Sequence, residues 1–195
     1  YFILEKMIFC HNKYICLVLF ICSIAQFTDA DQSTFYPIRY KNCKSQFDVL
    51  SVAITTDCSA TDRCQFPRGK DMAIQIVFKP NRRVDSLQTA VWAHLGDSRG
   101  ALTRFHIENE NACVASNITC PVEPGQTYWY TQPVQILEEY PAVEVQVNWL
   151  LTSPTATDSV DHQQSPAGGG TDRGQPPRAR EVCVKMLAKV MEKNE

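Results

Sequence analysis

The nine cysteines are the residues whose type and spacing bear most directly on chemistry in this chain of 195 residues. Two pairs lie close together, Cys58 with Cys64 and Cys113 with Cys120, with spacings C-x5-C and C-x6-C. Structural zinc sites use shorter spacings, such as C-x2-C combined with a second motif of the same kind. The spacing therefore predicts no metal site and favours disulfides.

Residues that could support catalysis are few. Beyond residue 30 the histidines are His94, His106 and His162, and the sequence contains neither a GxSxG nor an HExxH motif. A catalytic set needs a nucleophile and a base in a recognisable context, which these scattered residues do not provide. We expect no enzymatic activity and no cofactor, and we interpret the histidines as solvated surface groups.

The first 30 residues resemble a cleaved secretory signal peptide. Met7 is the expected start, with residues 1–6 upstream of it, and Lys13 precedes an apolar run over 14–25. That run is too short to span a bilayer. Thr28 and Ala30 are small residues at the positions that precede a cleavage site before Asp31. The sequence therefore predicts a secreted or extracellular protein, with delivery to lysosomes as the alternative destination.

Removing residues 1–30 also removes three of the cysteines and leaves an even number. In an oxidising compartment this predicts three disulfides. Six cysteines allow fifteen connectivities, so sequence arithmetic alone leaves the pairing open. The six are Cys43, Cys58, Cys64, Cys113, Cys120 and Cys183.

Charge and length limit the other classes of partner and fold. The net charge is −2, and the longest basic run is the Arg82-Arg83 pair, so nucleic acid is not an expected partner. Residues 31–195 are long enough for one domain with a single core. We expect that domain to be a monomer.

The elements that must position these residues are short strands. Segments with period-two alternation, or with a short apolar run between turn residues, indicate strands because successive side chains leave opposite faces of a sheet. Many short strands with no convincing amphipathic helix predict an all-β sandwich. The expected strands lie at 49–54, 72–78, 86–95, 102–107, 143–149 and 181–191.

The clearest alternation closes the stretch from Cys113 to Trp149. In it, Val143, Val145, Val147 and Trp149 alternate with polar residues. We predict that this apolar face lines a cavity for a lipid. A second strand adds the inward candidates Met72, Ile74, Ile76 and Phe78. Ordinary core packing is the alternative for each of these residues, and the pattern alone does not separate the two.

Residues 154–180 have a different composition from the rest. The segment is polar, contains a Gly triplet and several prolines, and lacks periodicity. Such a segment cannot bury enough apolar surface to offset the entropy lost on ordering, so we interpret it as a disordered insertion. The Gly triplet has no GK[ST] continuation, which disfavours a phosphate-binding loop.

Seven segments carry a resemblance to a known family, over residues 35–153 and 181–191. They are YKNC at 40–43, the loop between Cys58 and Cys64, FHIENENAC at 105–113, NITCPVEPGQTY at 117–128, PVQILEEYP at 133–141, VQVNWLL at 145–151 and VCVKMLAKV at 182–190. In this order they resemble the ML (MD-2-related lipid-recognition) domain family. The most similar branch is that of the Niemann-Pick type C-two sterol carriers (epididymal secretory proteins) and their arthropod relatives, which include the group-two mite allergens.

The resemblance implies an immunoglobulin-like β-sandwich of two antiparallel sheets with an internal lipid cavity. It also implies the pairing Cys43–Cys183, Cys58–Cys64 and Cys113–Cys120. Three lining positions carry over by motif, namely Phe105, Val134 and Tyr140. Two extra residues stand between Val134 and Tyr140 in this chain, which predicts an altered mouth.

The implied function is binding of a sterol, fatty acid or other lipid, and its transfer to a membrane or an acceptor protein. The alternative is a lipid-recognising co-receptor module of the kind found in innate immunity. Asn117-Ile118-Thr119 is an N-glycosylation sequon, so Asn117 is a candidate glycan site in a secreted chain.

Overall fold

The computed structural model describes residues 34–96, 102–154 and 178–192. The expected signal peptide at 1–30 and most of the insertion at 154–180 lie outside these ranges. Within them nearly all regular structure is β-strand, and the one helix is a single turn, α2 (Ala112–Ala115). Among the described residues, no helix has the length and apolar character needed to cross a membrane. The predicted all-β class is confirmed.

The first sheet is antiparallel and has four strands in the order β1-β3-β5-β8. β5 lies at its centre, and Met72 on this strand stands opposite Val134 on β8. The strands are β1 (Tyr36–Pro37), β3 (Asp48–Ile54), β5 (Lys70–Lys79) and β8 (Tyr128–Ile136).

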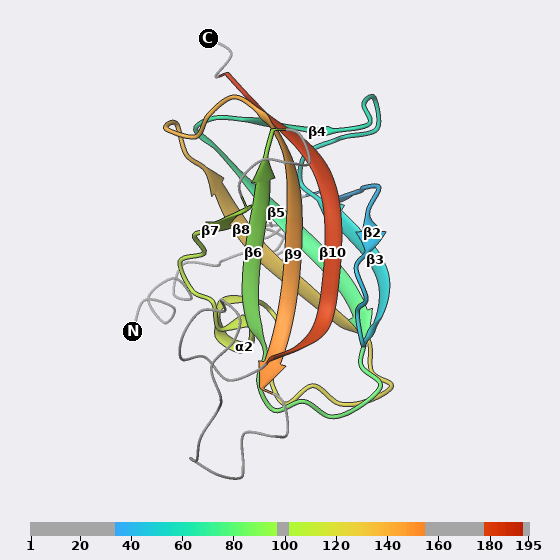
Figure 1. Cartoon of the computed structure of the whole chain (residues 1–195). Coiled ribbons are helices and arrows are strands. Elements are labelled where there is room, and N and C mark those ends of the chain that lie inside the picture. Colours follow the sequence, from blue (N-terminus) through green and yellow to red (C-terminus); the bar gives the residue numbers. More distant parts are fainter. Residues whose placement is uncertain (1–33, 97–101, 155–177, 193–195) are drawn as a thin grey trace, which may run out of the picture. The chain divides into compact units, whose positions relative to one another are not determined.

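The second sheet follows the order β2-β10-β9-β6-β7, and β4 also pairs with β10. Figure 1 shows the long strands β9 and β10 side by side across the molecule. The two antiparallel sheets predicted are therefore confirmed, and the pairing of β4 with β10 adds one short parallel ladder. The strands are β2 (Lys41–Asn42), β4 (Cys64–Pro67), β6 (Gln88–Leu95), β7 (Leu102–Phe105), β9 (Glu144–Pro154) and β10 (Arg178–Met191).

Several strand boundaries differ from the sequence prediction; those of β10 and β7 are examples. β10 begins at Arg178, whereas the polar composition of residues 154–180 predicts a strand that begins only at Glu181. Arg178 and Arg180 pair with Pro154 and Thr152 of β9, because a ladder is formed by backbone groups whatever the polarity of the side chains. β7 ends at Phe105, two residues before the predicted boundary at Ile107.

The core lies between the two sheets, where alternate residues of the facing strands are buried. On β5 every second residue from Met72 to Phe78 is buried, namely Met72, Ile74, Ile76 and Phe78. On β10 the buried set includes Val182, Val184, Met186, Ala188 and Val190. This arrangement is the one that period-two alternation predicts for two sheets packed face to face.

The three disulfides have the pairing that the resemblance implies. Cys43–Cys183 fastens the segment around β2 to β10 across a sequence separation of 140 residues. A bridge over so long a loop stabilises the fold by about 5 kcal/mol in the chain-entropy account.

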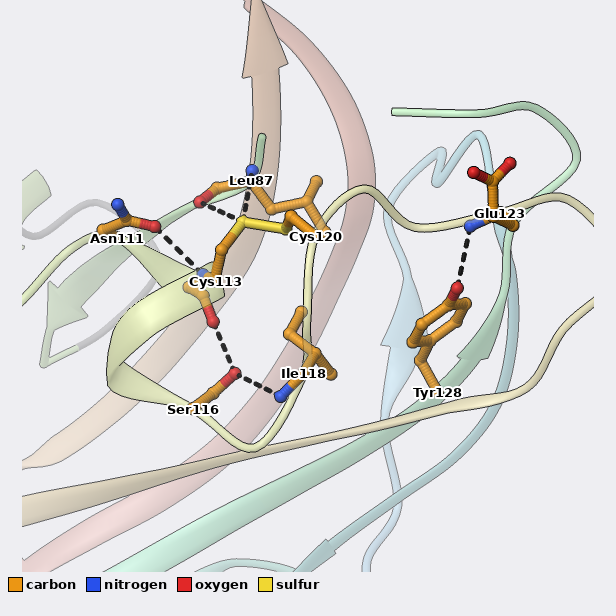
Figure 2. The surroundings of a disulfide bond; sticks show 9 residues. Leu87, Asn111, Cys113, Ser116, Ile118, Cys120, Glu123 and Tyr128 are labelled. Atoms are coloured by element: carbon orange, nitrogen blue, oxygen red, sulfur yellow. Dashed lines mark hydrogen bonds between the residues drawn. A yellow bond between two sulfur atoms is a disulfide. The ribbon is translucent and has the colours of Figure 1, made fainter. Parts of the chain in front are cut away.

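The Cys113–Cys120 bridge closes a compact turn around α2 (Figure 2). The side chain of Asn111 caps the helix by accepting a hydrogen bond from the Cys113 amide at 3.0 Å. The Ser116 hydroxyl accepts from the Ile118 amide at 3.3 Å. The turn therefore holds the Asn117 sequon in a defined position beside β8.

Candidate functional site

A hydrophobic cavity of about 50 Å³ lies between the two sheets. All of the side chains that line it are hydrophobic, and they come from seven strands of both sheets. They are Phe66, Met72, Ile74, Val91, Ala93, Phe105, Val134, Ile136, Val147, Trp149 and Met186.

Strand register brings these side chains together. Met72 and Val134 are direct cross-strand partners in the first sheet. In the second sheet Val91 stands between Trp149 on one side and Phe105 on the other. Because partners in a ladder point to the same face, each pair contributes two neighbouring side chains to the same wall.

A recess of about 230 Å³ lies beside the cavity and shares two of its lining residues, Phe105 and Val134. Tyr140 lines this recess, and its ring meets that of Phe105 edge to face, with centroids 5.4 Å apart. Burial, and then the neighbouring carboxylate of Glu139, raises the pKa of the Tyr140 hydroxyl above its ordinary value. The phenol therefore stays neutral, which suits an entrance for apolar molecules.

The loop that carries Tyr140 is fastened by the side chain of Arg68. The Nη1 atom of Arg68 donates hydrogen bonds to the carbonyl oxygens of Glu138 and Tyr140 at 3.1 and 3.2 Å. Arg68 also forms an ion pair with Glu192. The two residues that the resemblance predicts to be an insertion fall in this loop, so Arg68 positions the part of the mouth that is predicted to differ from the family pattern.

A polar bridge crosses the sandwich interior beyond the cavity. The hydroxyls of Thr89 and Tyr130 are 2.8 Å apart, and Tyr130 donates to the Gln132 side chain at 3.4 Å. All three residues are buried. Burial raises the pKa of Tyr130 well above its ordinary value, so the phenol serves as a neutral hydrogen-bonding group linking the two sheets.

The residues predicted for lipid contact fall into three groups. Ile74, Phe105, Val134, Val147 and Trp149 line the cavity together with Met72. Tyr140 lines the recess. The others are Ile76 and Phe78, which are fully buried away from the cavity, Val145, which is buried in the core, and Val143, which is partly buried beside it.

Several lining residues were missing from the sequence prediction. Val91 and Ala93 lie on a strand whose alternation is visible in the sequence, and Met186 lies on another. The alternation on these two strands could have identified Val91, Ala93 and Met186 as lining residues. Phe66 belongs to the four-residue strand β4, which is too short to give a periodic signal.

The chemistry of this site is exclusion of water from an apolar molecule. Among the residues that the structure describes, no group of three or more His, Cys, Asp or Glu side chains could hold a metal ion. His106 is exposed and lines the recess, whereas His94 lies on the outer face of the second sheet. His162 lies outside the described residues.

Comparison with known proteins gives consistent matches. A family model described as the ML domain matches residues 37–160. The protein heh-1 of Caenorhabditis elegans is 35% identical over 164 residues, covering 81% of this chain and 90% of that protein. NPC intracellular cholesterol transporter 2 of Bos taurus is 30% identical over 116 residues, covering 60% and 74%.

A solved structure shares the fold. The crystal structure of a Niemann-Pick type C2 protein from the Japanese carpenter ant gives a TM-score of 0.60 at 15% sequence identity. The match covers 78% of this chain and 99% of that one.

Proposed function

The chain belongs to the ML-domain family, and on that premise we propose that it is a secreted lipid carrier. It holds a sterol or a similarly sized lipid between its sheets and passes it to a membrane or an acceptor protein. The observation that carries this proposal is the wholly hydrophobic cavity beside a recess that Phe105 and Tyr140 help to line. Two relatives in this family are named as cholesterol transporters, which makes a sterol the first ligand to test.

The small volume of the cavity defines how such a ligand must enter. Ligand pockets are typically about 300–1,000 Å³, whereas this cavity has about 50 Å³. Binding therefore requires the walls to move apart. Met72 and Met186 suit this movement because methionine side chains are unbranched and adapt their shape readily.

The energy available from burial is large enough to drive this opening. A sterol that buries about 400 Å² of apolar surface gains on the order of 10 kcal/mol at about 25 cal/mol per Å². Association and reorganisation reduce that gain. No covalent step is needed, because release reverses the same process when the mouth meets a more favourable apolar environment.

The entry route is expected to pass between Phe105 and Tyr140. Phe105 lines both the recess and the cavity, and it ends the short edge strand β7. An edge strand has a ladder partner on one side only, so it can shift at a lower cost than a central strand. Phe105 therefore acts as the movable side of the entrance. Val134 lies on β8, which is also an edge strand but is held by a longer ladder, nine residue pairs with β5 against four between β7 and β6.

Organic extraction of protein secreted from eukaryotic cells, followed by mass spectrometry, tests the carrier function. A lipid that co-purifies at near-stoichiometric amounts is the expected result, and it would also identify the lipid class. A fluorescent sterol should then bind to the delipidated protein and move to acceptor vesicles. Absence of both extracted lipid and sterol binding would contradict the proposal.

Filling the cavity provides a variant test with a matched control. Ala93 lines the cavity, whereas Ala53 lies on the outer face of the first sheet. Ala93→Leu should reduce sterol affinity by about tenfold, since added methylene groups occupy the space that the ligand must open. Ala53→Leu introduces the same side chain and should leave the affinity within about twofold.

A further inference from the structure

A groove of about 740 Å³ crosses the outer face of the second sheet, on the side opposite the cavity. Its lining combines four cationic side chains, Lys41, Lys44, Arg180 and Lys185, with hydrophobic residues. We call it the cationic groove. The hydrophobic lining residues include Trp92, Leu102 and Leu150.

The four cations come from distant parts of the sequence and are brought together by the fold. β2 pairs with β10 so that Lys41 stands directly opposite Lys185. The Cys43–Cys183 disulfide fixes the segment that carries Lys41 and Lys44 against the same strand. Like charges placed directly opposite each other in a ladder are destabilising, so this arrangement needs a reason other than stability.

These cations lack the acidic partners that neighbouring cations have. Around the second sheet, Arg39 pairs with Asp62, Arg63 with Glu144 and Arg104 with Glu110. Within the described ranges, no ion pair joins Lys41, Lys44, Arg180 or Lys185 to a carboxylate, and no acidic residue lines the groove. The groove is therefore locally positive on a chain whose net charge is −2.

The floor of the groove is hydrophobic. Leu102 is 52% exposed, and Trp92 and Leu150 lie beside it, partly exposed. The guanidinium of Arg104 lies over the Trp92 ring, 5.9 Å from its centroid. An apolar centre with a charged rim is the arrangement found in protein–protein interfaces.

This combination selects among anionic partners. A flat bilayer would contact the rim cations without reaching the floor, and a sulfated polysaccharide has no apolar side chain to cover Leu102 and Leu150. A polypeptide that carries both acidic and apolar side chains satisfies the rim and the floor together. We propose that the cationic groove is the docking surface for an acidic segment of a partner protein. Carboxylates of this segment pair with Lys41, Lys44, Lys185 and Arg180, and its apolar side chains cover Leu102 and Leu150.

The docked segment would lie on the opposite face of the second sheet from the cavity. On β6, Trp92 faces the groove while Val91 and Ala93 face the cavity, and on β9, Asn148 faces the groove between Val147 and Trp149. The four cations do not line the cavity, so docking can be tested independently of lipid binding.

The test is fluorescence anisotropy with a short fluorescein-labelled peptide in which Asp and Leu alternate. The wild-type protein should bind it, and a peptide alternating Asp with Ser should bind more weakly because it cannot cover the hydrophobic floor. Lys41→Glu/Lys185→Glu should weaken binding of the Asp-Leu peptide by about tenfold or more, since charge reversal opposes the acidic partner. Lys41→Gln/Lys185→Gln should give a smaller loss and serves if the charge reversal disturbs folding.

The matched control is Lys70→Glu/Lys79→Glu, which reverses two exposed lysines of β5 in the other sheet. It should retain affinity for the Asp-Leu peptide within about twofold, since these lysines belong to the other sheet and do not line the groove. The proposal is wrong if the wild type does not bind the peptide, or if both reversals weaken binding equally. It is also wrong if heparin oligosaccharides or phosphatidylserine vesicles bind through Lys41 and Lys185 while the peptide does not. Sterol binding should be unchanged in all these variants.

Discussion

The two ends of the sandwich interior are filled differently, although the same strands run through both. At one end, the ring of Phe78 stacks between those of Phe47 and Tyr128, with centroids 5.8 Å apart in each pair. At the other end, Met72, Val134 and Phe105 border a cavity. We refer to these as the packed end and the hollow end.

Side-chain size on the facing elements accounts for this difference. β5 supplies Ile76 and Phe78 to the packed end, where aromatic rings fill the space between the sheets. The same strand supplies Met72 and Ile74 to the hollow end, where the small side chains of Val91 and Ala93 in the second sheet leave space among larger ones such as Trp149. Alternation therefore determines which face is buried, whereas the volumes of the facing residues determine whether it is filled.

The largest expected effect comes from truncating a ring at the packed end. Phe78 is fully buried, and Phe78→Ala should destabilise the protein by about 3–5 kcal/mol because it removes a buried ring and leaves a void. Urea unfolding monitored by circular dichroism measures this loss. In whatever fraction remains folded, sterol affinity should be close to that of the wild type. A loss below about 1 kcal/mol would show that the packed end is less tightly filled than the structure indicates.

The same truncation at the hollow end should have the opposite profile. Phe105 is only partly buried and borders a cavity that already exists, so Phe105→Ala should cost much less stability than Phe78→Ala. Sterol affinity should fall by about tenfold or more, since the ring forms both wall and entrance. Equilibrium titration with a fluorescent sterol measures this change. Unchanged affinity would contradict the placement of the ligand site.

The sequence predicted the face of each strand better than the position along it. Ile76 and Val145 were grouped with Ile74 and Val147 because they share an alternating pattern. That pattern contains no information about which end of the sandwich is open. The ordered cysteines and the family resemblance supplied the fold and the disulfide pairing.

Features built from distant segments were beyond prediction from the sequence. The parallel pairing of β4 with β10 joins segments more than a hundred residues apart. The cationic groove combines Lys41 and Lys44 with Arg180 and Lys185, none of which lies in a long basic run. Such contacts depend on topology and register, and a local pattern reports neither.

A kinetic effect is expected from the loop at the mouth of the hollow end. Arg68→Ala removes the hydrogen bonds to the carbonyl oxygens of Glu138 and Tyr140. The loop should then open more often, and the sterol dissociation rate should rise by roughly threefold to tenfold with a smaller change in affinity. Stopped-flow transfer to acceptor vesicles measures this rate. The control is Arg39→Ala, because the Arg39–Asp62 pair is highly exposed and should leave the rate unchanged.

The smallest structural effect is expected at the sequon, which lies beside β8 and lines neither the cavity nor the recess. Asn117 is exposed, and its Oδ1 atom accepts a hydrogen bond from the Thr131 amide at 3.0 Å. Its side-chain nitrogen makes no hydrogen bond with the residues that the structure describes and can carry a glycan, so protein secreted from eukaryotic cells should lose mass on treatment with an N-glycosidase.

Thr119→Ala tests this prediction more sharply than substitution of Asn117. It removes the sequon while keeping the hydrogen bond from Thr131 to Asn117, so any loss of mass reports the glycan alone. Because Thr119 is exposed, stability should stay within about 0.5 kcal/mol of the wild type. Asn117→Gln, in contrast, should remove the glycan and also weaken the contact with β8. Asn117 lines neither the cavity nor the recess, so sterol transfer by the glycosylated and Thr119→Ala proteins should proceed at the same rate. A faster rate for the unglycosylated variant would mean that the glycan reaches the hollow end.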